Sequence, residues 1–306
     1  MHKSKYIHLL ILIIAFGLQS CGGGDDTPNP APNPNPTPTP VSAYEACLPA
    51  VSDNTLEIIT WNIKNFPQND DETLEEVQEI IEDFDPDVIA LQEIADLDEF
   101  QVLVGNLEGW TGHVEHVSGS SQRLGYLFKT EEVTVMSTPS NLFAAGTDEN
   151  NRAFTSVRRP LHTKIKHTNG LELDLMNVHL KCGDGSEERR RLASEKLKDY
   201  IDTNLPESKV MILGDFNDEI VDPFDNVFQN FFDDETAYRF ATIGIAQGPS
   251  SGWSFPSWPS QIDQILITDE LWENELTTAV LKPGECVSSY SRDVSDHRPV
   301  MIKFQA

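Results

Sequence analysis

Basic residues and cysteines are scarce in this chain. Its 306 residues include 22 lysines and arginines against 50 aspartates and glutamates, and only 4 cysteines. The formal net charge of −28 repels polyanions at long range, so the composition excludes a protein that passively coats nucleic acid. The negative charge does not exclude an enzyme that binds phosphate through a bound cation. Hydrophobic residues make up 39% of the chain, which is enough for a packed core.

The apolar run at the N-terminus is too short to cross a membrane. It extends from about Ile7 to Leu18, after Lys3 and Lys5, and falls below the ~20 residues that a membrane span needs. This pattern predicts a signal peptide over residues 1–20. The next residue, Cys21, completes a stretch that resembles a bacterial lipobox. We therefore expect lipidation of Cys21, with ordinary secretion and cleavage nearby as the alternative.

Residues 21–54 are rich in proline and have little to bury. Three glycines and two aspartates are followed by proline at every second position from Pro28 to Pro40. Such a segment stays extended, so it predicts a tether that holds a folded domain away from a membrane. A spacer with no role is the alternative. The expected protein is an exported lipoprotein of the bacterial outer membrane or cell surface, with its folded domain in the periplasm or outside.

Helices and strands are intermixed over residues 55–306, with some strands following one another directly. This order predicts a single α/β domain of mixed sheets, because no internal repeat or second linker divides it. The expected helices cover residues 72–84, 98–107 and 187–205. The expected strands cover residues 56–63, 88–91, 125–129, 132–136, 157–167, 171–180, 261–268 and 298–304, besides a strand that ends at Asp215.

Acid and amide side chains follow a buried strand at residues 211–218. Three apolar residues and Gly214 precede Asp215 and Asn217. Side chains two apart on a strand point the same way, so these two are expected to face one spot. A carboxylate and a carboxamide suit a hard cation such as Mg²⁺, Mn²⁺ or Ca²⁺. A strand running into a turn explains the same residues without function.

Similar side chains stand where other apolar strands end. The full set is Asn62, Glu93, Asn177 with His179, Asp215 with Asn217, Asp263, and Asp296 with His297. Each alone has a plain structural explanation, such as a turn acid or a buried histidine with a partner. Together they supply carboxylates for a cation, amides for oxyanions and imidazoles for proton transfer. That combination matches metal-assisted hydrolysis of a phosphoester.

The ordered motifs resemble the endonuclease/exonuclease/phosphatase superfamily, which has the deoxyribonuclease I-like fold. They are Trp-Asn-Ile at Asn62, Leu-Gln-Glu at Glu93, Arg-Arg-Pro at Arg158, Asn-Val-His-Leu at His179, Gly-Asp-Phe-Asn at Asp215, Ile-Asp-Gln-Ile at Asp263 and Ser-Asp-His-Arg-Pro at His297. The resemblance spans residues 55–306. It implies a four-layered α/β sandwich, with two packed mixed β-sheets flanked by helices and the active site across one edge.

The resemblance also implies roles for these residues. Asn62 and Glu93 would bind Mg²⁺, and Asp263, Asp296 or the Asp215 pair would complete the metal site, with Mn²⁺ or Ca²⁺ as alternatives. His179 and His297 would be the acid/base histidines, next to Asn177. Asp215 and Asn217 would orient water and phosphate oxygens, and Asp263 or Asp296 would hold the tautomer of His179. Arg158 would neutralise phosphate charge, with Arg159 as the fallback.

Two departures from the deoxyribonuclease I pattern weaken an assignment to double-stranded DNA. Ala95 stands where that enzyme has a minor-groove arginine, and Gln122 and Leu124 replace a tyrosine and a histidine-supporting glutamate. His297 must therefore have another partner. The expected reaction is hydrolysis of DNA or RNA phosphodiesters by a monomer. A phospholipid or sugar phosphate substrate is the alternative, followed by a non-catalytic binding module.

Three further features leave alternatives open. Arg189, Arg190 and Arg191 begin a helix and would bind phosphate or pair with nearby glutamates. Trp253 and Trp258 would stack on bases, insert into lipid or pack beneath their loop. With Cys21 lipidated, at most one intrachain disulfide can form, and Cys182 with Cys286 is the favoured pair because both would lie beside the active site.

Overall fold

The computed structural model describes residues 42–48, 54–117, 119–222 and 224–305. The predicted signal peptide, Cys21 and most of the predicted tether lie outside the described residues. The chain divides into two units, Met1–Pro40 and Val41–Ala306. The fold below is that of the second unit.

The first sheet of this unit has six strands in the order β12-β13-β1-β2-β4-β3. Only β1 and β2 are parallel, and the other neighbours are antiparallel, so the sheet is mixed. Its strands are β1 (Thr55–Phe66), β2 (Val88–Ile94), β3 (Trp110–Val114), β4 (Arg123–Lys129), β12 (Glu275–Val280) and β13 (Val300–Gln305).

The second sheet has seven strands, six of them in the order β10-β11-β9-β8-β7-β5, with β6 paired to β7. Here β8 and β9 are the parallel pair. Its strands are β5 (Val133–Val135), β6 (Ser140–Asn141), β7 (Leu161–His167), β8 (Glu172–His179), β9 (Val210–Asp215), β10 (Tyr238–Phe240) and β11 (Asp263–Thr268).

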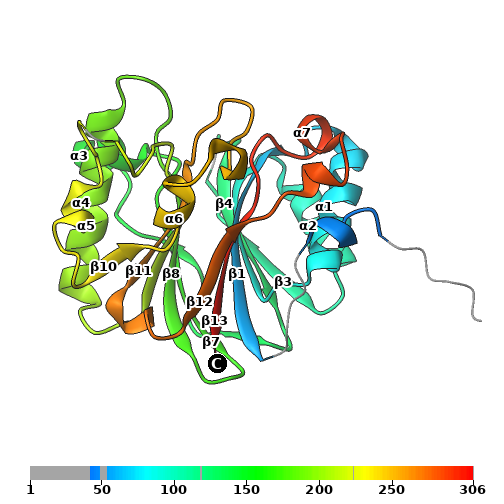
Figure 1. Ribbon diagram of the computed structural model, residues 1–306, viewed down its shortest axis with the longest axis horizontal. Coiled ribbons are helices and arrows are strands. Elements are labelled where there is room, and N and C mark those ends of the chain that lie inside the picture. The colour runs from blue at the N-terminus through cyan, green and yellow to red at the C-terminus, as the bar shows by residue number, and fades with distance from the viewer. Residues whose placement is uncertain (1–41, 49–53, 118, 223, 306) are drawn as a thin grey trace, which may run out of the picture. The chain divides into compact units, whose positions relative to one another are not determined.

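The helices lie on the outer faces of the two sheets. The α-helices are α1 (Asp70–Phe84), α2 (Leu97–Asn106), α3 (Asp148–Phe154), α4 (Glu187–Asn204), α5 (Gln229–Phe232), α6 (Ile243–Ala246) and α7 (Tyr290–Asp293). Short 3₁₀ helices are η1 (Glu45–Cys47), η2 (Ser250–Gly252), η3 (Asp269–Leu271) and η4 (Pro283–Glu285). Figure 1 shows α1 and α2 outside one sheet and α3, α4 and α5 outside the other.

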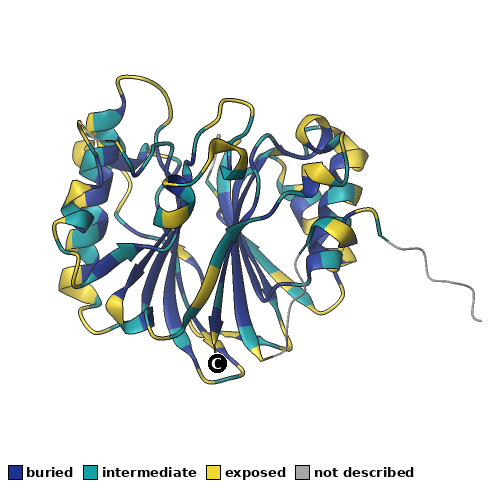
Figure 2. Ribbon diagram, in the orientation of Figure 1, coloured by how far each residue is buried: buried dark blue, intermediate teal, exposed yellow. Residues whose placement is uncertain are grey.

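Successive side chains of a strand point to opposite faces of the sheet, and apolar residues on both faces produce these layers. In β1, Leu56 and Ile58 point between the sheets, whereas Ile59 and Trp61 point toward α1 and α2. Three apolar clusters result, one between the sheets and one under each set of helices. Figure 2 shows the buried strands in the middle and exposed residues on the outer helices. The expected four-layered α/β sandwich is confirmed.

Most expected elements are present, with shifted ends. The strand expected over residues 157–167 begins only at Leu161, which leaves Arg158 in the preceding loop. The expected elements do not include β3, β6, β10, β12, α3 or the short helices α5, α6 and α7. Strand β12 has no fully buried residue, and β3 and α3 each mix polar residues into a short segment. Their weak apolar periodicity explains the omission.

The folded unit begins before Thr55. Tyr44 is 1% exposed and packs with the α1 and α2 cluster, and its hydroxyl donates to Glu76 Oε2 at 2.6 Å. Residues 42–48 of the predicted tether therefore belong to the folded unit. Among the described residues, no helix is both long and apolar enough to span a membrane.

The expected Cys182–Cys286 disulfide is wrong. Cys286 bonds to Cys47, with Cα atoms 5.9 Å apart, while Cys182 is exposed and free. The proline-rich composition of residues 21–54 predicted an extended tether that includes Cys47. In the structure, the packing of Tyr44 on α1 brings Cys47 beside η4 instead. The disulfide thus fastens residues 42–48 to the segment that leads into β13.

Replacing Cys47 with serine should lower the free energy of unfolding by about 2–4 kcal/mol, because the crosslink no longer restricts the unfolded chain. Chemical denaturation under non-reducing conditions measures this. Cys182→Ser is the matched control, and its exposed side chain should change stability by less than about 0.5 kcal/mol. Equal stability of the two variants would contradict this role for the disulfide.

Candidate active site

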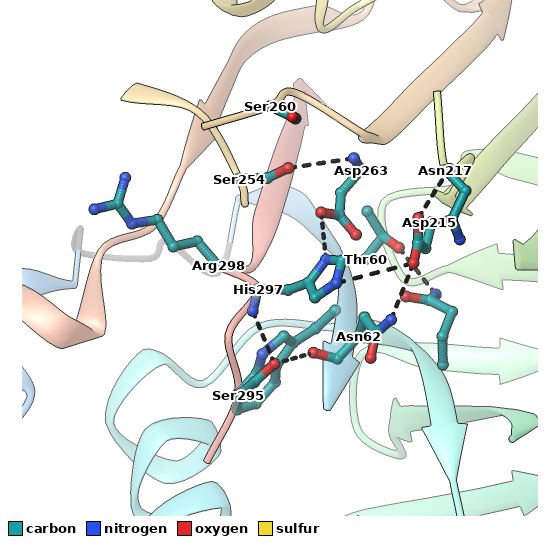
Figure 3. A network of polar contacts seen from close by, with 12 residues as sticks. Thr60, Asn62, Asp215, Asn217, Ser254, Ser260, Asp263, Ser295, His297 and Arg298 are labelled. Carbon is teal, nitrogen blue, oxygen red and sulfur yellow. Dashed lines mark hydrogen bonds and ion pairs between the residues drawn. The ribbon is translucent and has the colours of Figure 1, made fainter. Parts of the chain in front are cut away.

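Six strand ends meet at one edge of the sandwich and carry the candidate residues. The parallel pair β8 and β9 places His179 directly opposite Asp215, and the antiparallel neighbour β11 places Asp263 on the other side of Asp215. From the other sheet, β1 contributes Asn62, and the loop before β13 contributes His297. Figure 3 shows Asn62, Asp215, Asp263 and His297 pointing toward one another.

Asp215 lies at the centre of this arrangement. Its Oδ2 accepts a hydrogen bond from Asn62 Nδ2 at 3.0 Å and lies 3.5 Å from His179 Nε2 and 4.0 Å from His297 Nε2. The residue is 2% exposed, and burial raises the pKa of its carboxyl group. A buried carboxyl group with a raised pKa is suited to proton exchange near neutral pH.

Gly214 is required for Asp215 to reach this position. Its φ is 148°, and a Cβ atom there would lie 1.9 Å from the carbonyl oxygen of Val178 on the neighbouring strand. No larger residue fits so close to that backbone. The glycine therefore lets β9 approach β8 where the two strands present Asp215 and His179.

His297 is held by Asp263. Asp263 Oδ2 lies 2.8 Å from His297 Nδ1, so Nδ1 carries a proton and Nε2 faces Asp215. Burial alone would lower the pKa of His297, but the charge and hydrogen bond of Asp263 outweigh it and raise the pKa to about 10. His297 is therefore an imidazolium at neutral pH. Asp263 supports His297 and not His179, contrary to the expected tautomer partner.

His179 has the opposite protonation state. Its Nε2 lies 2.9 Å from Arg158 Nη1, which can only donate, so Nε2 accepts and Nδ1 carries the proton. Burial and the guanidinium charge hold the pKa of His179 well below its usual range. Its buried Nδ1 has no hydrogen-bond partner among the described residues. The two histidines thus differ in charge at the same pH, so His297 is the one suited to act as an acid.

Glu93 reaches the site through unusual backbone geometry. Its φ is 65°, and Lys64 and Asn65 opposite it also have positive φ, at the irregularity where the β1 and β2 registers shift. Asn65 N–H donates to Glu93 Oε2 at 3.1 Å, which leaves Oε1 3.8 Å from His179 Nε2. Left-handed backbone at non-glycine residues is costly and often marks functional sites.

Asn217 and Asn177 bind groups of the protein itself and face the site less directly than expected. Asn217 forms a turn in which its N–H donates to Asp215 Oδ1 at 2.9 Å, and its side chain donates to the Leu180 carbonyl. The functional and turn explanations of this stretch therefore both apply. Asn177 lies deeper between the sheets, where Nδ2 donates to the Leu91 and Gly125 carbonyls. It shares a face with His179 but joins the two sheets beneath the site.

Asp296 is more exposed than the buried carboxylates Asp215 and Asp263. Its Oδ2 lies 3.1 Å from Lys64 Nζ, and a quarter of its side chain is exposed. Lys64 is not among the expected site residues, because no signal in the sequence marks it. Ser295 is not among them either, although it belongs to the Ser-Asp-His motif; it accepts from His297 N–H and donates to the Asn62 carbonyl.

Tyr290 contacts the site from α7, although it is not among the expected site residues. Its hydroxyl accepts from Trp61 Nε1 at 3.0 Å and donates to the His297 carbonyl at 2.7 Å, which ties α7 to the site. No motif in the sequence includes it. A buried tyrosine between a strand and a catalytic loop becomes visible only when the sheets are assembled.

The arginine cluster makes contacts within the protein. Arg189 donates to the Asn151 and Arg152 carbonyls, and Arg191 pairs with Asp225. Arg190 is buried and bridges Asp218 to the Lys181 carbonyl, so it connects the turn after Asp215 with the segment after His179. These contacts agree with side-chain pairing and not with phosphate binding. Arg159 likewise binds the Phe143 carbonyl, away from His179.

The two tryptophans differ. Trp253 donates from Nε1 to the Ile245 carbonyl, as expected for packing beneath the loop, while Trp258 is 77% exposed. Phe255 lies between them in the sequence, and its ring packs against His297 with centroids 4.7 Å apart. This loop therefore forms one wall beside the imidazolium.

The donor set at this edge fits a hard divalent cation. Glu93, Asn62 and Asp215 offer carboxylate and amide oxygens, which Mg²⁺ prefers. Asp215 and Asp263 lie with His297 in a group whose members are all within 4.8 Å of one another, and the two carboxylates are the cation donors there, because the imidazolium has no free lone pair. Asp263 Oδ1 and Gln92 Oε1 are buried without a hydrogen-bond partner among the described residues. Buried oxygens without donors are expected where a cation or its water ligands bind.

Comparison with solved structures supports this fold. A D. rerio TDP2 humanized by 14 mutations is 15% identical, with a TM-score of 0.66 over 83% of this chain and 100% of that chain. An endonuclease/exonuclease/phosphatase from Bacteroides vulgatus is 18% identical, with a TM-score of 0.63 over 82% and 98%. The human Nocturnin catalytic domain with bound sulfate is 18% identical, with a TM-score of 0.59 over 82% and 94%.

These identities are low, so the structural likeness shows the fold alone. No curated protein matches the chain in sequence. The family model of the Endonuclease/Exonuclease/phosphatase family matches residues 59–297, which is well over half of the chain and includes every candidate residue from Asn62 to His297. The chain therefore belongs to the Endonuclease/Exonuclease/phosphatase family.

Proposed function

We propose that this protein is a divalent-metal-dependent phosphodiesterase that hydrolyses DNA or RNA, most simply as an endonuclease. The observation that carries the proposal is the convergence of Asp215, Asn62, His179 and the Asp263–His297 pair at one buried edge. A D. rerio TDP2 of similar fold was solved with a single-strand DNA product, which supports a nucleic acid substrate.

Glu93 and Asn62 would hold the cation, with Asp215 or Asp263 beside it. Asp296 stays a further proposed ligand, which would have to exchange Lys64 for the ion. The chemistry supplied by a bound Mg²⁺ is neutralisation of charge on the phosphate oxygens. Mn²⁺ or Ca²⁺ are the other candidates, since the donors are mainly oxygen.

The protein's own groups divide the proton transfers. Asp215, with its raised pKa, orients and deprotonates the attacking water, with Asn217 fixing the turn around it. His297 donates its Nε2 proton to the leaving oxygen, since Asp263 keeps it charged. Arg158 presents positive charge to the phosphate, and His179 accepts from that guanidinium and orients it.

A phospholipid or sugar phosphate substrate is the second candidate. Beside Glu93, the groove next to Pro67 and Ala95 is lined by Asp70, Asp71, Asp96 and Glu99. Four carboxylates on that side would repel an extended polyanion. The groove thus favours a short or only locally charged substrate over a long duplex.

We also propose that the protein is an exported monomer, anchored to the membrane through lipidated Cys21. The apolar run before Cys21 and the proline-rich residues after it support this. The Cys47–Cys286 disulfide agrees with an oxidising compartment.

The purified protein should hydrolyse DNA or RNA with Mg²⁺ and lose that activity with a chelator. His179→Ala should lower the rate by about 10²–10⁴-fold, as expected when a group that orients the reacting centre is removed. The measurement is a substrate panel of single- and double-stranded DNA, RNA, sphingomyelin liposomes and inositol phosphates. Cleavage of only the last two would replace the nucleic acid proposal. An unchanged rate in His179→Ala would show that the measured hydrolysis does not come from this site, which would favour a binding module.

Asp263→Asn should move the alkaline limb of the kcat/KM profile from near pH 10 toward pH 7. The imidazolium of His297 is present below its pKa and is lost above it, and the substitution removes the charge that raises that pKa. Asp296→Asn is the matched comparison, because Asp296 pairs with Lys64 and has no hydrogen bond to the His297 ring. The alkaline limb of the kcat/KM profile should move less in that variant. Profiles that shift equally would show that the charge of Asp263 is not what sets the pKa of His297.

Cys21→Ser should release the protein from membranes into the soluble fraction, since the lipid would have no attachment site. Fractionation of cells that express each form measures this. Membrane retention of the variant would contradict lipid anchoring, whatever the enzyme's substrate.

A further inference from the structure

A second group of carboxylates and imidazole lies at the opposite end of the sandwich. Asp87 precedes β2, Glu132 lies between β4 and β5, and His167 ends β7. One donor atom from each of these residues lies within 4.8 Å of the other two. Asp87 N–H donates to the Glu57 carbonyl in β1, and Glu57 is five residues before Asn62. The group is therefore roughly 17 Å along the strand from the active site.

The group bridges the two sheets. Asp87 directly precedes β2 of the first sheet. His167 belongs to the second sheet and points between the two sheets, because it lies two residues beyond buried Ile165. His167 Nε2 lies 3.5 Å from Glu132 Oε2 and 3.9 Å from Asp87 Oδ2, too far for hydrogen bonds. Nε2 has no other partner among the described residues, although the side chain is 1% exposed. It is a buried polar atom that faces two carboxylates without bonding to either.

Each of these two oxygens is oriented by a donor behind it. Asp87 Oδ2 accepts from Glu57 N–H at 2.8 Å, and Glu132 Oε2 accepts from Thr168 Oγ1 at 2.7 Å. Such supporting hydrogen bonds are typical of metal ligands. They hold both oxygens toward His167 without neutralising their charge.

The local charge is also unbalanced. Glu57 is paired with Lys303, and Asp85 is paired with Lys129. Within the described part of the chain, Asp87 and Glu132 have no lysine or arginine within 4 Å, although the charge of paired Lys129 reaches both. Two carboxylates remain, and one divalent cation would balance them. Burial is the main cause that raises the pKa of Asp87 to about 8, as expected for a carboxyl group that has no cation beside it.

We propose that Asp87, Glu132 and His167 bind a divalent transition-metal ion of the Zn²⁺ class, distinct from the catalytic cation. One imidazole with two carboxylates suits Zn²⁺ and its neighbours, whereas Mg²⁺ and Ca²⁺ prefer all-oxygen sets. Ligand atoms around tetrahedral Zn²⁺ are about 3.3–3.4 Å apart, given bonds of ~2.0–2.1 Å. The observed 3.5 and 3.9 Å thus need only sub-ångström closure. Water takes the fourth position through the side of Glu132, which is 23% exposed.

Binding also changes one hydrogen bond. Asn169 N–H donates to His167 Nδ1 at 3.3 Å, slightly beyond the usual range. With the ion on Nε2, Nδ1 carries the proton, so Asn169 N–H must turn away. The turn at residues 168–170 therefore adjusts when the ion enters. The ion would crosslink the two sheets at the end opposite to catalysis and stabilise the folded state.

The test uses the full protein, stripped by a chelator and then kept in excess Mg²⁺ so that the catalytic cation site is filled. Co²⁺ is titrated and its visible spectrum recorded, and Zn²⁺ is added in a separate thermal melt. We expect one four-coordinate Co²⁺ per chain and a rise in Tm on the order of 5 °C with Zn²⁺. His167→Gln and Glu132→Gln should each abolish both signals, while phosphodiesterase activity with Mg²⁺ continues.

Asp263→Asn is the matched control from the active-site group, and it should retain the Co²⁺ spectrum. If His167→Gln does not fold, Glu132→Gln decides, because that side chain is partly exposed and its amide preserves the Thr168 contact. A Co²⁺ spectrum or Zn²⁺ stabilisation that persists in Glu132→Gln overturns the proposal, as does a spectrum lost only in Asp263→Asn. A protein without phosphodiesterase activity would contradict the proposed function alone, because the Co²⁺ spectrum and the Zn²⁺ melt do not depend on a substrate.

Discussion

The hydrogen bond from Asn62 to Asp215 joins the two sheets at the edge where the candidate site lies. It connects the end of β1 with the end of β9, and the other contacts extend from it. Asp215 reaches His179 in its own sheet and His297 from the loop before β13, while Ser295 fixes that loop to the Asn62 carbonyl. The position of every reacting group therefore depends on how the two sheets are packed.

That packing also explains the separate protonation states of the two histidines. Both are buried, and burial alone would favour the neutral form of each. His297 has the carboxylate of Asp263 beside it, whereas His179 has the guanidinium of Arg158. Leaving a charge buried without a partner costs several kcal/mol, so the partner decides which imidazole is charged. A charged and a neutral imidazole can thus coexist a few ångströms apart.

The distribution of polar groups follows from the construction of the sandwich. Between the sheets the strands are apolar, and each fully buried aliphatic side chain contributes about 1.5–3 kcal/mol. Polar side chains are placed between the sheets mainly near the strand ends, where loops supply donors and water has access. The active-site edge and the Asp87, Glu132 and His167 group at the other end are two outcomes of this constraint, with different donor sets and different expected ions.

Apolar periodicity predicted most individual strands and helices, because strand and helix periods are local properties of the chain. The two packed sheets with outer helices followed from the resemblance of the ordered motifs to the family. The sequence also indicated that Asn177 and His179 lie on the same face of one strand. Only the packed structure showed that Asn177 joins the two sheets while His179 faces the site. The partner of Asp263, the roles of Lys64 and Tyr290, and the Cys47–Cys286 disulfide depended on contacts between distant segments. Such contacts are decided by the tertiary structure, since sequence spacing does not specify which strand ends become neighbours in space.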